Sequence, residues 1–120
     1  MAKLMTDAMI DGGLTAMSTC TRISVLSAEP ASITDITTTY MLATTSLTGG
    51  DFTIADGDVS GRKDTVAQKA AISITNSGTA THVAIDDGTD YIVTTCTSQA
   101  LTAGGTVTIP TWKREIADPT

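Results

Sequence analysis

The feature that most constrains this sequence is a series of short alternating runs, rich in β-branched residues, that stop at Gly, Asn, Asp or Pro. About one residue in five is threonine, whose stiff side chain suits a pleated strand better than a helical turn. The runs 22–28 and 82–86 alternate apolar and polar residues and stop at Glu29-Pro30 and Asp87-Gly88. This period of two predicts strands with one buried face.

The remaining runs predict the same kind of element, with turns rather than helices between them. We predict further strands at 40–47, 62–68, 70–75, 91–93, 107–109 and 112–116, and loops at 31–39 and 55–61. Asp87-Gly88 predicts a type I′ hairpin. The apolar face switches from odd to even numbers at Pro110, which predicts a one-residue bulge. The sequence therefore predicts a mainly β fold, an antiparallel β-sandwich of Ig-like or jelly-roll-like type.

The N-terminal segment has a different period. Apolar residues at 4–17 recur at spacings of three and four, which predicts a short helix or arm. Gly12 and Gly13 each cost a helix interior about 1 kcal/mol, so the helix ends there or needs a partner. We divide the chain into a helix or arm at 1–20 and a β-sandwich at 21–120, since 120 residues suffice for one core.

A methionine-rich amphipathic arm is typical of a segment that docks onto another surface. We therefore predict an intermolecular interface at Leu4, Met5, Met9 and Ile10. The chain has few aromatic residues, so burial between copies would add to the stability of a thin core.

Charge and hydropathy exclude several classes of partner. Seven Lys and Arg against 13 Asp and Glu give a net charge of −6 with no basic stripe, which argues against binding nucleic acid. No apolar run reaches 18 residues and no signal segment is recognisable, so we expect neither a membrane partner nor secretion.

The two cysteines do not form a metal or redox motif. Cys20 and Cys96 lack CxxC spacing and clustered histidines. They are interpreted as small buried side chains or, alternatively, as a disulfide. We expect no cofactor.

One acidic segment has ligand-like spacing. Asp56, Asp58 and Ser60 match the opening of an EF-hand calcium loop, and Asp64 falls at its ninth position. Ala67 occupies the twelfth position, where a bidentate Glu should close the shell. The segment is interpreted as an acidic surface turn or, alternatively, as a weak cation site.

Other polar residues have ordinary structural explanations. His82 lies within a predicted strand and no triad signature accompanies it. Asp86, Asp87 and Asp90 suit a hairpin tip. Trp112 ends an apolar run, which favours a core position over stacking on a sugar. We therefore expect no enzymatic activity.

Two stretches resemble a known group of proteins. These are Thr-Arg-Ile-Ser-Val-Leu-Ser-Ala-Glu-Pro at 21–30 and the run from Thr79 to Trp112, which includes His-Val-Ala-Ile at 82–85, Thr-Thr-Cys-Thr at 94–97 and Thr-Val-Thr-Ile-Pro at 106–110. Together they resemble small virion proteins of tailed bacteriophages, of the head decoration (cement) type or the fibre and tail-associated type. The likeness covers most of residues 5–119.

The resemblance implies a β-sandwich that assembles in many copies, and it supplies no active-site residues. The implied function is that of a capsid decoration protein that stabilises the head shell, with the major capsid protein or other virion proteins and copies of itself as partners. Its implied location is the virion, assembled in host cytoplasm. The alternatives are a tail, collar or fibre-associated adaptor, or a carbohydrate- or calcium-binding module.

Overall fold

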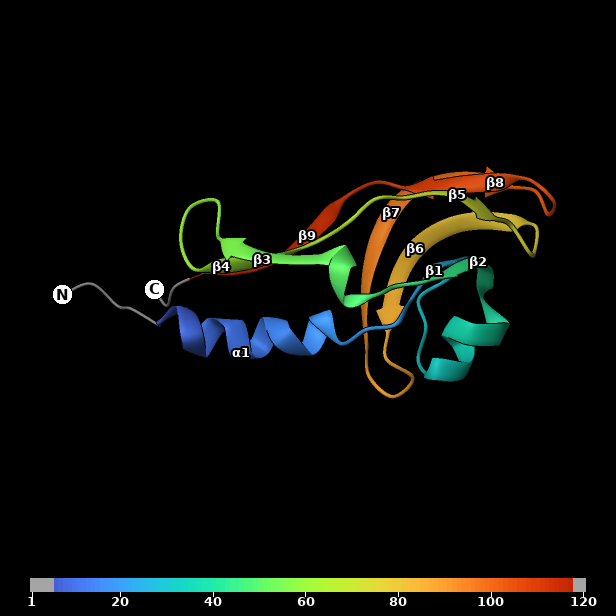
Figure 1. Cartoon of the computed structure of the whole chain (residues 1–120). Helices are drawn as coiled ribbons and strands as arrows, with labels where there is room; N and C mark the ends of the chain where they lie inside the picture. Colours follow the sequence, from blue (N-terminus) through green and yellow to red (C-terminus); the bar gives the residue numbers. More distant parts are fainter. Residues whose placement is uncertain (1–5, 118–120) are drawn as a thin grey trace. The chain divides into compact units, whose positions relative to one another are not determined.

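The computed structural model describes residues 6–117 and is mainly β, with one short N-terminal helix (Figure 1). Its elements in chain order are α1 (Asp7–Ser18), β1 (Arg22–Leu26), the helical turn η1 (Asp35–Thr39), β2 (Met41–Ser46), the 3-10 turn η2 (Gly49–Asp51), β3 (Phe52–Asp56), β4 (Arg62–Val66), β5 (Lys69–Ser73), β6 (Gly78–Asp86), β7 (Tyr91–Leu101), β8 (Thr106–Ile109) and β9 (Trp112–Ile116). The paired strands of these elements run antiparallel. The predicted fold class, a mainly β, antiparallel, sandwich-like fold with a short N-terminal helix, is confirmed.

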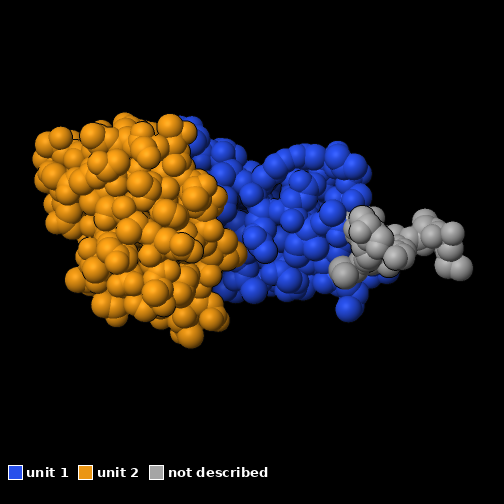
Figure 2. Space-filling model, turned by 180° about the vertical axis from the view of Figure 1, so that it is seen from behind, with its two compact units in different colours: residues 1–19, 48–68, 110–120 blue, residues 20–47, 69–109 orange. Residues whose placement is uncertain are grey.

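The described chain forms two compact units, coloured separately in Figure 2. Unit 1 contains 6–19, 48–68 and 110–117, and unit 2 contains 20–47 and 69–109. The chain thus passes between the units four times. The sequence division set the helix at 1–20 apart from all the strands, whereas in the structure the helix shares unit 1 with β3, β4 and β9.

In unit 1, α1 packs on a three-stranded sheet of order β3-β4-β9. The helix buries Ile10, Leu14 and Met17, a spacing that places them on one face. The helix continues through Gly12 and Gly13 because this apolar face has the sheet as its partner, which offsets the low helix propensity of glycine.

Unit 2 is built on a four-stranded sheet of order β2-β1-β6-β7, with β5 and β8 forming a two-stranded ribbon. The central strands β1 and β6 have consecutive buried residues where they pair, so both faces of this sheet are covered. On one face, Leu26 and Ala84 pack with Ile36 from η1. The ribbon joins the sheet edge through the bridge between Ala43 and Ile74. This layering is the sandwich-like part of the fold.

Two predicted loops contain regular structure. The loop expected at 31–39 includes η1, whose Ile36 is fully buried. The sequence of η1 does not predict a helical turn, because threonine has low helix propensity. The turn is stabilised by the burial of Ile36 against the sheet. The loop expected at 55–61 begins later, since β3 extends to Asp56 by pairing with β4. Strand β3 itself was not predicted.

The one-residue bulge predicted at Pro110 is wrong. Strand β8 ends at Ile109 as the partner of β5, and β9 begins at Trp112 as the partner of β4 in the other unit. Because proline lacks an N–H group, it ends the first ladder. The change of apolar face therefore marks a change of sheet.

The type I′ hairpin predicted at Asp87-Gly88 is also wrong. The connection between β6 and β7 has four residues, since Asp86 pairs with Tyr91. Only Gly88 in this loop has positive φ, at 95°, whereas a type I′ turn needs two such residues. The Asp87 side chain accepts hydrogen bonds from the N–H groups of Thr89 and Asp90, both at 2.8 Å, so a side-chain cap replaces the predicted turn geometry.

Candidate functional site

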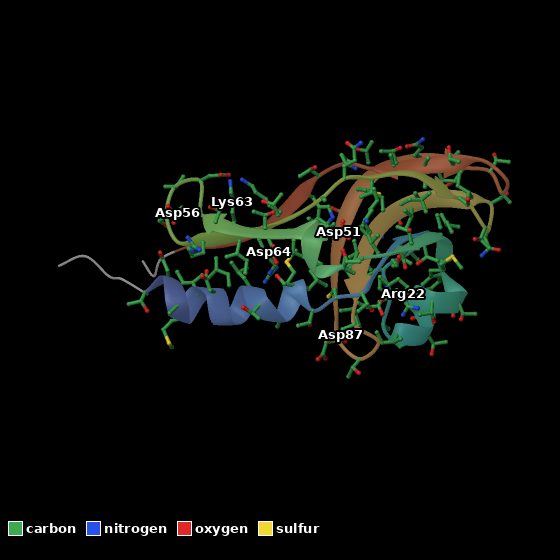
Figure 3. The ribbon with its side chains drawn as sticks, in the orientation of Figure 1. Arg22, Asp51, Asp56, Lys63, Asp64 and Asp87 are labelled. Carbon is green, nitrogen blue, oxygen red and sulfur yellow. The ribbon has the colours of Figure 1, made fainter. Side chains whose placement is uncertain are left out.

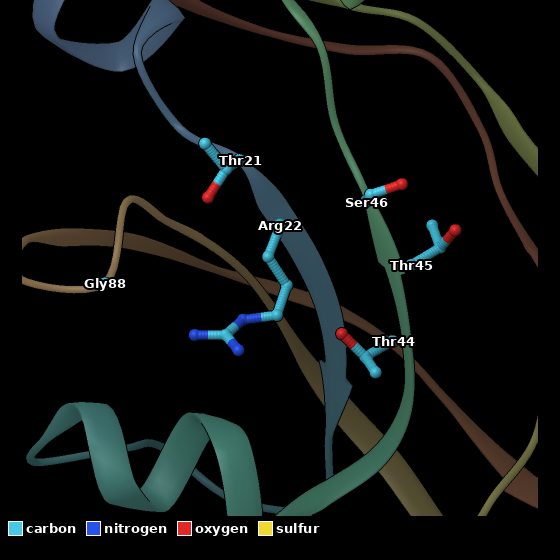
Figure 4. Close-up of a pocket in the computed structure, with 6 residues that line it drawn as sticks. All are labelled: Thr21, Arg22, Thr44, Thr45, Ser46 and Gly88. Carbon is cyan, nitrogen blue, oxygen red and sulfur yellow. The ribbon is translucent and has the colours of Figure 1, made fainter.

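A surface hollow of unit 2 lies where β1 begins, β2 ends and the β6–β7 loop turns (Figure 4). It encloses about 460 Å³ and is open to solvent. Its lining residues are Thr21, Arg22, Thr44, Thr45, Ser46 and Gly88. The register of the sheet explains this grouping, because Arg22 pairs with Ser46 on one side and with Asp86 on the other.

The guanidinium of Arg22 is held by a fully buried carboxylate. Its Nε lies 2.9 Å from Asp86 Oδ1 and its Nη2 lies 2.6 Å from Asp86 Oδ2. The N–H of Gly88 donates to the same Oδ2 at 3.0 Å. The hydrogen bond to Asp86 raises the pKa of Arg22 above its ordinary value, while partial desolvation works against it. The pair is a bidentate charge-assisted contact that holds the side chain of Arg22, one of the lining residues, in place.

The neighbouring loop is also held by a carboxylate. Hydrogen bonds from the N–H groups of Asp90 and Thr89 lower the pKa of Asp87 below its usual range. Asp86 and Asp87 are therefore both engaged in holding the loop that borders the hollow.

Several polar groups that border the hollow are engaged in contacts within the chain. The charge of Arg22 is balanced by Asp86, and Thr44 donates its hydroxyl to the carbonyl of Ile23 at 3.2 Å. His82 pairs with Leu26 at the far end of the β1–β6 ladder, four residues or about 13 Å along β6 from Asp86. Its ring Nδ1 lies 2.8 Å from the hydroxyl of Thr81. The lining of the hollow thus consists of hydroxyl side chains, the guanidinium of Arg22 and Gly88.

The candidate cation residues are placed in unit 1, where Figure 3 labels Asp56 and Asp64. Asp56 is exposed and its Oδ1 accepts a hydrogen bond from Arg62 Nη1 at 2.7 Å. Asp58 pairs with Lys63 at 2.7 Å and with Lys113. Ser60 lies in the loop between β3 and β4. Basic side chains thus lie against the two exposed carboxylates where a cation would bind.

Asp64 does not face this loop. It is fully buried on β4, and its Oδ2 accepts a hydrogen bond from Ser18 Oγ of α1 at 2.7 Å. Desolvation raises the pKa of Asp64, and hydrogen bonds from Ser18 and from the N–H of Thr53 oppose that shift. Its Oδ1 is buried with no hydrogen-bond partner. Within residues 6–117, no group of three or more His, Cys, Asp or Glu side chains is arranged to hold a metal ion.

The predicted interface residues are divided by the structure. Leu4 and Met5 lie outside the described residues. Met9 is 71% exposed on α1, whereas Ile10 is 1% exposed and packs inside unit 1. Val59, at the tip of the β3–β4 loop of the same unit, is 98% exposed. Met9 and Val59 are thus apolar side chains that unit 1 presents to solvent.

The two cysteines and Trp112 are buried to different degrees. Cys20 is buried and Cys96 is half-buried, and no disulfide joins them. Burial raises the pKa of the Cys96 thiol. Trp112 is half-buried with its indole Nε1 enclosed and without a hydrogen-bond partner.

Comparison of the chain with protein-family models, with curated proteins and with solved structures gives no match. No helix among residues 6–117 has the length and apolar character needed to cross a membrane.

Sequence reasoning missed the Arg22–Asp86 pair and the burial of Asp64. Asp86 reads as a turn residue because it precedes Asp87-Gly88, and Arg22 reads as the polar start of a strand. Their contact depends on the β1–β6 register, which joins residues 64 positions apart. The available signal was the position of Asp86 directly after a fully apolar Val-Ala-Ile run, which favours a buried strand end.

Proposed function

We propose that this chain is a non-enzymatic structural protein of a bacteriophage virion, a capsid decoration protein that binds the head shell in many copies. The resemblance of residues 21–30 and 79–112 to such proteins motivates the assignment. The observation that carries it is the exposure of Met9 on α1, beside a buried face that already holds the helix in place.

A rigid helix with an exposed methionine suits docking onto another protein. The helix is anchored through Leu14 and Met17, so Met9 can be buried by a partner without first ordering the backbone. Methionine adapts its shape to irregular apolar surfaces. Val59, on a loop of the same unit, is a second exposed apolar side chain. The polar, threonine-rich surface elsewhere keeps the subunit soluble before it docks.

The decisive experiment is cryo-electron microscopy of the virion that contains this chain, with copy number measured by quantitative mass spectrometry. Density distributed over the capsid shell in hundreds of copies is the expected result. A single ring at one vertex would replace the proposal with a tail or collar adaptor. Absence of the chain from purified virions would overturn both.

A binding assay identifies the docking surface. Shells stripped of the protein are mixed with the wild type, with Met9→Ser and with the matched control Ala8→Ser, whose exposed position lies on the same helix. We expect Met9→Ser to weaken binding at least about tenfold, as loss of a buried apolar contact predicts. Equal binding by Met9→Ser and the control would exclude Met9 from the interface.

A further inference from the structure

Strand β7 is an open edge of the main sheet. It has 11 residues, Tyr91–Leu101, and is the last strand in the order β2-β1-β6-β7, with β6 as its partner among the described residues. The opposite edge strand, β2, is covered: Ala43 bridges to Ile74, and the N–H groups of Thr75 and Asn76 donate to the carbonyl of Leu42. Among the described residues, the β2 edge of the sheet is therefore covered by backbone contacts, whereas the β7 edge is open.

The open edge lacks the features that normally prevent strand pairing. Soluble proteins protect edge strands with charged residues, prolines or short length. Strand β7 contains no charged residue, no proline and no glycine, and the charge-free stretch extends from Tyr91 to Trp112. The edge strands of unit 1 differ, since β3 carries Asp56 and β9 carries Lys113, Arg114 and Glu115.

The geometry of β7 locates the segment that is able to pair. Ala80 and His82 of β6 face Gln99 and Thr95 of β7, so the residues 96–98 form a bulge. Before this bulge, Tyr91 to Thr95 keep a regular register with β6. This segment reads Tyr-Ile-Val-Thr-Thr, an aromatic followed by four β-branched residues, which is the composition that strands prefer.

We propose that β7 pairs with β7 of a second copy, antiparallel about a twofold axis at Val93, to form one continuous eight-stranded sheet. In this register Tyr91 faces Thr95 of the other copy, Ile92 faces its Thr94, and Val93 faces its own counterpart. Each facing pair joins aromatic or β-branched residues, the combinations that stabilise a sheet. The arrangement satisfies the unpaired backbone groups of both edges at once.

Charge favours a second copy as the occupant. Each chain has a net charge of −6, so two copies repel one another over most of their surfaces. A strand without charge is where identical acidic chains approach at least electrostatic cost. The segment is also self-complementary about Val93, as an isologous interface requires. Strand pairing uses backbone groups in the plane of the sheet, so Val93 keeps its packing against the Leu26 cluster.

Paired charges at the two ends of the segment test both the contact and its register. Tyr91→Lys with Thr95→Lys places lysine opposite lysine twice across the axis. Tyr91→Glu with Thr95→Lys places glutamate opposite lysine at the same positions. Within one chain residues 91 and 95 are about 13 Å apart, so a charge contact between them arises only across the twofold axis. Residue 91 also faces Asp86 of its own β6, and circular dichroism reports any effect of that contact on folding. Thr53→Lys with Thr111→Lys is the matched control, since both threonines are exposed and outside β7.

Sedimentation equilibrium of the purified chain over a range of concentrations provides the measurement. We expect the wild type and the control to reach twice the 12.3 kDa mass of one chain. The lysine pair should raise the dimer dissociation constant about tenfold or more, and the glutamate–lysine pair should retain the dimer. Far-ultraviolet circular dichroism checks that all variants are folded.

Three results would overturn the inference: a wild type that stays monomeric at about 0.5 mM, equal weakening by both β7 variants, or equal weakening by the control. The inference does not depend on the proposed virion function, because the dimer is measured with the isolated chain. A monomeric chain found over the capsid shell would remove the inference alone, and a dimer absent from virions would remove the function alone.

Discussion

At the scale of single residues, two buried carboxylates differ in the groups that replace their contacts with water. Asp64 and Asp86 are both fully buried carboxylates, but Asp86 faces a guanidinium and Asp64 faces a hydroxyl. A buried charge is tolerated when a counter-charge and hydrogen bonds replace water, and is costly otherwise. The buried charge of Asp86 is thus compensated by a guanidinium, whereas that of Asp64 has hydrogen bonds alone.

Asp64→Asn should change how stability depends on pH. The pKa of Asp64 in the folded state is raised above 3.8, so the folded chain binds this proton more tightly than the unfolded chain. Its contribution to the free energy of unfolding is fully present below pH 3.8 and is lost as pH rises through the folded pKa. We expect Asp64→Asn, which does not titrate, to gain stability relative to the wild type on going from pH 4 to pH 7.

Urea unfolding at both pH values measures this difference. Asp56→Asn serves as the control, because that carboxylate is exposed. A wild-type minus variant difference that is the same at pH 4 and pH 7 would contradict the assignment of Asp64 as a destabilising buried charge.

Arg22→Met should destabilise the chain strongly. The substitution leaves the buried Asp86 carboxylate without its bidentate partner, a situation that typically costs about 3–5 kcal/mol. Replacing both partners, as in Arg22→Met with Asp86→Leu, should cost less than Arg22→Met alone, since no unpaired charge is then buried. Urea unfolding of the two variants provides the comparison. A double variant no more stable than the single one would show that the unpaired charge of Asp86 is not the cause of the lost stability.

Gly61→Ala should destabilise the β3–β4 connection. Gly61 has φ of +69°, and a Cβ there would collide with the carbonyl oxygen of Ile116 on the adjacent strand β9. We expect a loss of about 2 kcal/mol or more, combining backbone strain and the steric clash. Gly49→Ala is the control, because no atom lies within 4 Å of a Cβ at that position. Thermal unfolding that ranks the two variants equally would contradict this account.

At the scale of elements, α1 illustrates how a partner surface overrides local propensity. Two consecutive glycines would end an isolated helix of 12 residues. Ile10, Leu14 and Met17 bury one face of the helix in unit 1, and Arg62 of β4 holds Asp11 by a hydrogen bond of 2.9 Å from Nε. The hydrogen bond to Asp11, and to a smaller extent the one to Asp56, raise the pKa of Arg62 above its ordinary value.

Leu14→Ala should therefore unfold the helix more readily than a substitution on its exposed face. Leu14 is 1% exposed, and truncation of a buried leucine costs about 2–5 kcal/mol. Met9→Ala, on the exposed face of α1, should cost less than about 0.5 kcal/mol. Circular dichroism during urea titration measures both, and similar losses for the two variants would mean that the helix is not held by its buried face.

At the scale of the whole molecule, the sequence by itself determined the fold class and most of the strands. β-branched residues with a period of two predict β1, β2, β4 and β6 within a few residues, because alternation and side-chain stiffness act locally. The same local signals placed the helix at the N-terminus. These predictions needed no knowledge of which segments meet.

Only the tertiary structure decided which strands share a sheet and which polar side chains are buried. Pro110 reads as a bulge in one strand, but β8 and β9 belong to different sheets. Asp64 reads as part of a cation loop, but its place on β4 turns it toward α1. Arg22 and Asp86 meet through the register of β1 and β6. In each case the outcome depends on pairing between residues far apart in the chain, which a local pattern does not encode.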